Sequence, residues 1–377
     1  LVVTIIVLLI LAGVAINLTI GSNGIFTRAE NAVDIWKEAS ENEEKELQNA
    51  EDFIDQYTDN KEDIKVSDVI GGDKFDTTTT IKDESGDDIT IPGGFGIADD
   101  SGIDIDDGIV IEDEKENQFV WVPVENINNM IKTETVPLNK VQISTNKYSI
   151  LRIIDSNKQN YGTVKPGDTS SVREPDVLSD YDTKSENINT ILEKDGTIED
   201  LAQEFVNEYT NMVKSIEKYN GFYIGRYELT GSLEDPREKS GQVLTSGNWY
   251  ELYNSCKKIV NTNYAKTSMI YGCQWDEVCN WLKDEYNTDT DSSSWGNYNA
   301  VINTGTDSNY EAKKIYDLAG NYCEWTQEAH GDLSRVTRDP YTIDGSGQKV
   351  AASRFIVAPQ SGFSLTTRAT LYLKISD

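Results

Sequence analysis

The sequence predicts an α+β protein in which a long amino-terminal helix precedes a β-rich region and a mixed helical and stranded region. Residues 1–20 are mostly apolar and carry no charge. From residue 60, short runs of β-branched and aromatic residues alternate with turn residues, and from residue 197 amphipathic helical patterns join them. The 377 residues exceed one ordinary core. We therefore expect parts at 1–58, 59–118 and 119–377, with an irregular insertion around 126–196.

The composition argues against nucleic-acid binding. Asp and Glu number 65 against 34 Lys and Arg, a net charge of −31, and no basic cluster could follow a phosphate backbone. The acidic tract from Asp99 to Glu116 lacks the spacing of a calcium-binding loop, so we interpret it as a solvated loop.

Residues 1–20 form a candidate membrane helix. Sixteen of them are apolar, and as a helix they would extend about 30 Å, the thickness of a bilayer core. After the break GSNG at 21–24, apolar or small residues recur every three or four positions from Ala29 to Tyr57, which predicts an amphipathic helix. A cleaved secretory signal and a plain single-pass anchor are the alternatives.

This pattern, LVVTIIVLLILAG followed by a glycine break and an amphipathic helix, resembles the type IV pilins and pseudopilins, although it lacks the acidic residue that this family usually has near its start. The resemblance implies leader removal by a prepilin peptidase, storage in the membrane, and packing against copies of itself in an extracellular filament made by pilus assembly machinery. The residues expected in this assembly helix are Val3, Val7, Leu8, Leu11, Val14, Leu18, Val33 and Trp36.

Local patterns predict three elements in the middle of the chain. Residues 109–111 and 119–122 are apolar runs separated by polar residues, so we expect paired strands. Residues 126–196 combine possible strands, at 140–145 and 148–154, with a long polar tract, which is typical of an insertion or long loop. A helix should begin after Thr197, because Thr197 and Asp200 fit a capping box before an apolar face.

The carboxy-terminal part carries an ordered set of motifs. They are GFYIGRYELTG, NWYELYNSCKKI, MIYGCQWDEVCNWL, SSSWGNY, DLAGNYCEWTQ at 317–327, and TTRATLYLK. Their order resembles the formylglycine-generating-enzyme family, a variant of the C-type lectin-like fold. The resemblance implies that residues 119–377 form a mixed α/β domain of that fold.

The resemblance also implies a candidate calcium site in the 317–327 motif. In calcium-binding relatives, matching positions supply oxygen ligands, and here these are Asp317, Gly320, Tyr322 and Glu324. The alternative is that Asp317 and Glu324 cap backbone amides in a loop without an ion.

The catalytic groups of that family are missing from this sequence. Its aerobic enzymes use a cysteine pair beyond the tryptophan motif, but no cysteine follows Cys323. Its iron-dependent relatives need several histidines, and His330 is the only one. We therefore predict that the chain is not an enzyme.

The cysteines and the late loops offer two further interpretations. The first concerns Cys256, Cys273, Cys279 and Cys323, which form either one or two disulfides or remain buried thiols. In lectin-like relatives, including the variable proteins of diversity-generating retroelements, loops before the last strand bind ligands. That implies a candidate ligand face of Trp295, Arg338, Tyr341 and Arg354, with ordinary surface residues as the alternative.

Together these patterns predict a structural subunit of a cell-surface filament that is membrane-inserted before assembly and displays a lectin-like domain. The alternative is a low-copy tip adhesin, or a membrane-anchored receptor, that binds a surface ligand through this domain. Calcium is the one cofactor that we expect, and copies of the chain are the main partner.

Overall fold

The structure is a computed structural model. The residues it describes are Lys45, 63–130, 143–144, 147–151, 172–176, 189, 191–192, 196–330, 334–339, 349–361 and 365–375. The predicted membrane and assembly helix at 1–58 therefore lies outside the described residues, apart from Lys45. Within the described part of the chain, none of the helices has both the length and the apolar character that a bilayer crossing requires.

The chain divides into two compact units, residues 1–63 and residues 64–377. The second unit contains both helices and strands, so the α+β class is confirmed at this level. No division appears at residue 119, because strands from both sides of that position share one sheet. The expected connector at 59–118 is thus continuous with the domain in its described part.

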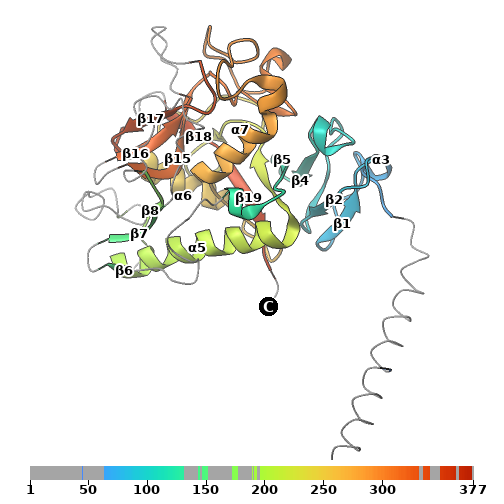
Figure 1. Cartoon of the computed structure of the whole chain (residues 1–377), viewed down its shortest axis with the longest axis horizontal. Helices are drawn as coiled ribbons and strands as arrows, with labels where there is room; N and C mark the ends of the chain where they lie inside the picture. Colours follow the sequence, from blue (N-terminus) through green and yellow to red (C-terminus); the bar gives the residue numbers. More distant parts are fainter. Residues whose placement is uncertain are drawn as a thin grey trace, which may run out of the picture. The chain divides into compact units, whose positions relative to one another are not determined.

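A six-stranded antiparallel sheet has the order β12-β19-β9-β5-β4-β3. Three of its strands, β4, β5 and β19, are labelled in Figure 1. Its strands are β3 (Phe95–Ile97), β4 (Val110–Asp113), β5 (Gln118–Pro123), β9 (Gly221–Gly225), β12 (Ala265–Met269) and β19 (Ala369–Leu373). The strands predicted at 109–111 and 119–122 are β4 and β5, and Val110 pairs with Val120.

A second sheet has the order β17-β16-β15-β8-β7-β6, and β18 pairs in parallel with β15. Its strands are β6 (Ile143–Ser144), β7 (Lys147–Leu151), β8 (Val172–Asp176), β15 (Cys323–His330), β16 (Ser334–Arg338), β17 (Arg354–Val357) and β18 (Leu365–Thr367). The segment expected to be an irregular insertion, 126–196, therefore contributes three strands to this sheet. β6 and β7 pair with each other nearby in sequence, whereas β8 pairs with the distant β15, a contact that local patterns do not reveal.

Three two-stranded pairs and five helices complete the described elements. The pairs are β1 (Thr79–Lys82) with β2 (Asp88–Ile91), β10 (Thr230–Gly231) with β11 (Pro236–Arg237), and β13 (Glu311–Ala312) with β14 (Ile315–Tyr316). The helices are α3 (Val66–Val69), α4 (Ile127–Met130), α5 (Ile198–Tyr219), α6 (Trp249–Ile259) and α7 (Gly272–Tyr286), with 3-10 turns at Ile105–Asp107 and Ser308–Tyr310.

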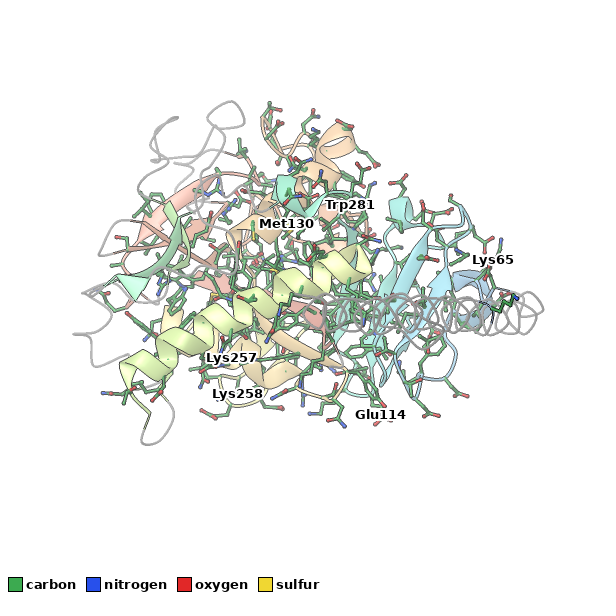
Figure 2. All side chains as sticks on the ribbon, turned by 60° about the horizontal axis from the view of Figure 1, so that its bottom comes forward. Lys65, Glu114, Met130, Lys257, Lys258 and Trp281 are labelled. Atoms are coloured by element: carbon green, nitrogen blue, oxygen red, sulfur yellow. The ribbon has the colours of Figure 1, made fainter. Side chains whose placement is uncertain are left out.

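The start of α5 follows the predicted capping box. The Thr197 hydroxyl accepts a hydrogen bond from the Asp200 backbone N–H at 3.1 Å, and the Asp200 carboxylate accepts one from the Thr197 N–H at 3.0 Å. The two bonds satisfy N–H groups that a helix start leaves without partners. The helix lies against β9 and β19, and Figure 2 shows it in front of the strands.

Apolar side chains cover both faces of the six-stranded sheet. On β5, Phe119 and Trp121 join one buried cluster, whereas Val120 and Val122 join another. Because successive strand residues point to opposite faces, the two clusters lie on opposite sides of the sheet. Residues 64–377 therefore have a core of their own around this sheet.

Replacing Trp121 by alanine should lower the free energy of unfolding by about 3–5 kcal/mol. The indole is 1% exposed and makes an edge-on contact with the Tyr223 ring, with centroids 4.9 Å apart. Urea unfolding of the full chain in mild detergent, followed by circular dichroism, measures the loss. The control is Ile103→Ala, at a side chain that is 39% exposed, which should cost no more than about 0.5 kcal/mol. Equal losses for both variants would contradict this core.

Candidate functional site

The motif at 317–327 forms the loop between β14 and β15 and the first half of β15. Asp317, Gly320 and Asn321 have positive φ angles of 53°, 88° and 60°. A Cβ atom at Gly320 would lie 2.2 Å from the backbone oxygen of Asn297. Glycine is therefore required here both by the backbone angle and by the close approach of another segment.

The end of this loop is held by a buried ion pair between Glu324 and Arg368. The Arg368 Nη2 atom lies 2.6 Å from Glu324 Oε1, and Nε lies 2.8 Å from Oε2. The same guanidinium donates to the backbone oxygens of Gly225 and Tyr316, each at 3.0 Å. Arg368 thus connects the start of the loop, the end of the loop and β9.

Arg368 also stands between the two sheets along the chain. The strand before it, β18, pairs with β15 of the second sheet, and the strand after it, β19, pairs with β9 and β12 of the first. A fixed contact at this single residue therefore positions the 317–324 loop relative to both sheets.

Two further carboxyl groups bind backbone amides of the loop. Glu228 accepts hydrogen bonds from the Tyr322 N–H, at 3.1 Å, and from the Asn321 side-chain amide. Asp339 accepts one from the Gly320 N–H. The sequence left amide capping open as the alternative to a metal site, but it assigned the capping to Asp317 and Glu324. In the structure, Glu228 and Asp339 cap these amides.

Asp317 is held at the other side of the loop. Its Oδ2 atom accepts hydrogen bonds from the Thr304 hydroxyl at 2.9 Å and from the Gly305 N–H at 3.3 Å. Its Oδ1 atom is buried and has no close hydrogen-bond partner among the described residues, and the same is true of Asn297 Oδ1, although the Asn297 side chain interacts with the Asp317 carboxyl group and acts to lower its pKa. Each of these two oxygens could face a cation or a proton.

Burial shifts the protonation of these acids. It raises the pKa of Glu228 well above its usual value, and the neighbouring Asp317 and Glu324 raise it further. Burial also raises the pKa of Asp317 and brings the pKa of Asp339 to about 7. The loop therefore has more buried carboxyl groups than counter-charges, and protons neutralise part of the excess.

The four predicted calcium ligands do not fit a calcium ion in this structure. Calcium needs six to eight oxygen atoms directed at one centre, but both carboxylate oxygens of Glu324 accept hydrogen bonds from Arg368. Of the two carboxyl side chains in this set, that of Asp317 has a buried oxygen without a partner among the described residues. Among the described residues, no group of three or more His, Cys, Asp and Glu side chains is arranged to hold a metal.

The candidate ligand face is not an exposed surface in this structure. Arg338 and Arg354 are fully buried, and each forms an ion pair with Glu328, at 2.8 and 2.9 Å, and with Asp276, at 2.8 Å. Trp295 is 6% exposed, and Tyr341 lies outside the described residues. The two arginines belong to β16 and β17 and pack against α7, which is why they are buried instead of lying on surface loops.

The four cysteines form no disulfide, so the buried-thiol alternative applies. Burial raises the pKa of Cys256 and Cys279 far above the usual value, and it raises that of Cys323 to about 12. A thiol with such a pKa is protonated at neutral pH and is a poor nucleophile.

The histidine that the sequence singled out, His330, is the last residue of β15.

Three residues that hold the loop were not assigned this role from the sequence. Glu228 and Arg368 lie in the motifs GFYIGRYELTG and TTRATLYLK, and membership of these motifs was the available signal. Asp339 follows β16 and carried no recognisable pattern.

No protein-family model and no curated protein matches this chain. Among solved structures, the variable protein 1 of Treponema denticola is similar over 40% of this chain and 84% of its own length, at 12% sequence identity and a TM-score of 0.29. A likeness at this score defines neither the fold nor the function of the chain.

Replacing Gly320 by alanine should destabilise the protein by about 2 kcal/mol more than replacing Gly86. Both glycines have positive φ angles, 88° and 98°, so both variants bear backbone strain. A Cβ atom at Gly86 meets nothing within 4 Å, whereas one at Gly320 meets the Asn297 backbone. Urea unfolding compares the two variants. Equal losses would mean that the close approach of the two segments does not limit residue 320.

A buried acid beside Arg368 gives the protein a pH dependence. Glu238 accepts a hydrogen bond from the Ala369 N–H at 2.6 Å through Oε1, and its buried Oε2 atom has no partner among the described residues. Burial raises its pKa well above the usual 4.5. The folded chain therefore keeps a proton here at pH values where the unfolded chain has lost it.

The change Glu238→Gln should flatten the pH dependence of stability. Because the folded-state pKa is raised, the contribution of the proton is complete below the unfolded-state pKa and is lost as the pH rises toward the folded-state value, by about 1.4 kcal/mol per pH unit. Urea unfolding from about pH 5 to about pH 7 measures this. The free energy of unfolding should decline less steeply with pH in the variant, by about 1.4 kcal/mol per pH unit. Parallel declines for the two proteins would show that Glu238 is ionised in the folded chain.

Proposed function

We propose that the protein is a structural subunit of an extracellular filament that resembles a type IV pilus. Residues 1–20 assemble the filament, and residues 64–377 are displayed on its surface. The observation that carries the proposal is the division of the chain after Asp63. It separates an uncharged apolar run from a compact unit that has its own core on both faces of a sheet.

The apolar residues 1–20 suit both a bilayer, before assembly, and the centre of a filament, after assembly. Exposing apolar surface to water costs about 25 cal/mol per Å², so residues 1–20 need a bilayer before assembly and copies of themselves afterwards. A prepilin peptidase and pilus assembly machinery are the partners that such a route requires. The displayed unit supplies the acidic, soluble exterior of the filament.

The displayed unit acts as a surface module in this proposal, not as an enzyme. Buried thiols with raised pKa values are poor nucleophiles, and the acids of the 317–324 loop are engaged in ion pairs and hydrogen bonds. A minor tip subunit or a membrane-anchored receptor would use the same chain at low copy number, and filament composition separates these alternatives from a major subunit.

Replacing Val7 by aspartate should abolish filament formation. A charge at the centre of an apolar helix costs about 2.5–3.5 kcal/mol in a bilayer, and it would also be buried without a partner between subunits. We expect the yield of sheared filaments to fall at least about tenfold, the factor that about 1.4 kcal/mol produces. Electron microscopy of the sheared fraction measures this yield.

The matched control is Val7→Ile, which keeps the apolar character and should leave filaments unchanged. Circular dichroism of detergent-extracted chains should show the same folded content in both variants. Normal filament yield from Val7→Asp would contradict assembly through this segment.

A further inference from the structure

We infer that the guanidinium of Arg368 holds the 317–324 loop in the place of a calcium ion, and that the protein folds without calcium. This inference concerns the internal structure of residues 64–377 and does not depend on filament assembly. The family resemblance implies four calcium ligands, but one of them, Glu324, binds Arg368 instead.

The contacts of Arg368 join the same two ends of the loop that a calcium ion would join. Its Nη2 atom donates to Tyr316 O, directly before Asp317, at 3.0 Å, and to Glu324 Oε1 at 2.6 Å. Its Nη1 atom donates to Gly225 O on β9 at 3.0 Å. One planar group thereby closes the loop and ties it to the central sheet, as a bidentate guanidinium can do.

The charge of Arg368 is permanent. Burial acts to lower its pKa, but Glu324, with smaller contributions from Glu228 and Glu238, outweighs this effect and the pKa is raised. A divalent cation bound to Glu324 would therefore lie beside a buried positive charge, where repulsion is only weakly screened. We therefore expect calcium and the Arg368 guanidinium to compete for this carboxylate.

The middle of the loop is also fixed by groups of the protein. Carboxyl oxygens accept from the Gly320 and Tyr322 backbone amides, through Asp339 and Glu228. Loop geometry that a metal would otherwise impose on the backbone is thus supplied by hydrogen bonds between buried groups.

Without Arg368, the buried Glu324 carboxylate would need another cation to balance its charge. Glu324 would become a buried charge without its partner, and the Asp317 Oδ1 and Asn297 Oδ1 atoms already have no hydrogen bond among the described residues. Oxygen atoms of this kind are the ligands that calcium prefers. The structure therefore assigns calcium independence to the natural chain and calcium sensitivity to a variant without the guanidinium.

The test is the melting temperature of the full chain in mild detergent, measured with EDTA and with excess calcium chloride. The natural chain should melt at the same temperature in both. A native calcium site filled to about 100 times its Kd would instead raise the melting temperature by several degrees. A melting temperature that falls in EDTA and recovers with calcium would overturn the inference.

Variants separate the role of the guanidinium from general destabilisation. Arg368→Met should melt lower than the natural chain and regain part of the loss with calcium. The double variant Arg368→Met with Glu324→Gln has no uncompensated charge at position 324, so it should melt above Arg368→Met and show no response to calcium. Both results are specific to an ion pair that occupies the place of a metal.

The matched control is Arg226→Met, because the Arg226 side chain is also buried but pairs with Asp100, at 2.7 Å, and not with a carboxylate of the 317–324 loop. It should not respond to calcium. An equal calcium response of Arg226→Met and Arg368→Met would overturn the inference. If Arg368→Met does not fold, Arg368→Lys keeps the charge and should melt lower without any calcium response, whereas a response of the lysine variant would contradict the account.

Discussion

The buried pair of Arg368 and Glu324 is the contact on which the arrangement of residues 64–377 depends. Arg368 is the single residue between β18, which belongs to one sheet, and β19, which belongs to the other. Breaking one side of a buried ion pair leaves an uncompensated charge and typically costs about 3–5 kcal/mol. The pair therefore fixes where the chain leaves one sheet for the other, and with it the position of the 317–324 loop.

Buried arginine–carboxylate pairs also connect β16, β17 and α7. Arg338 and Arg354 both bind Glu328, and all three side chains are fully buried. Asp276 of α7 adds a second acid that both arginines contact. Ionic groups thus replace apolar packing in this part of the core, and their directional bonds specify how the strands lie against the helix.

Local features could be predicted from the sequence, whereas long-range pairing could not. The capping box at Thr197 and the strands around Val110 and Val120 each depend on residues that are neighbours in the sequence. Arg338 and Arg354 were predicted on a surface because nothing in their vicinity along the chain identifies Asp276 as a partner. The resemblance of the motif to calcium-binding relatives likewise gave no sign that Arg368 binds the Glu324 carboxylate, because the two residues are far apart in the sequence.

The most direct test of the proposed function is electron microscopy of filaments sheared from the producing cells, with mass spectrometry of the same fraction. The account predicts abundant regular fibres composed mainly of this chain, with residues 64–377 on their outer surface. Fibres that lack the chain, or that contain it only at rare tips, would contradict a major structural subunit and favour a tip adhesin or an anchored receptor.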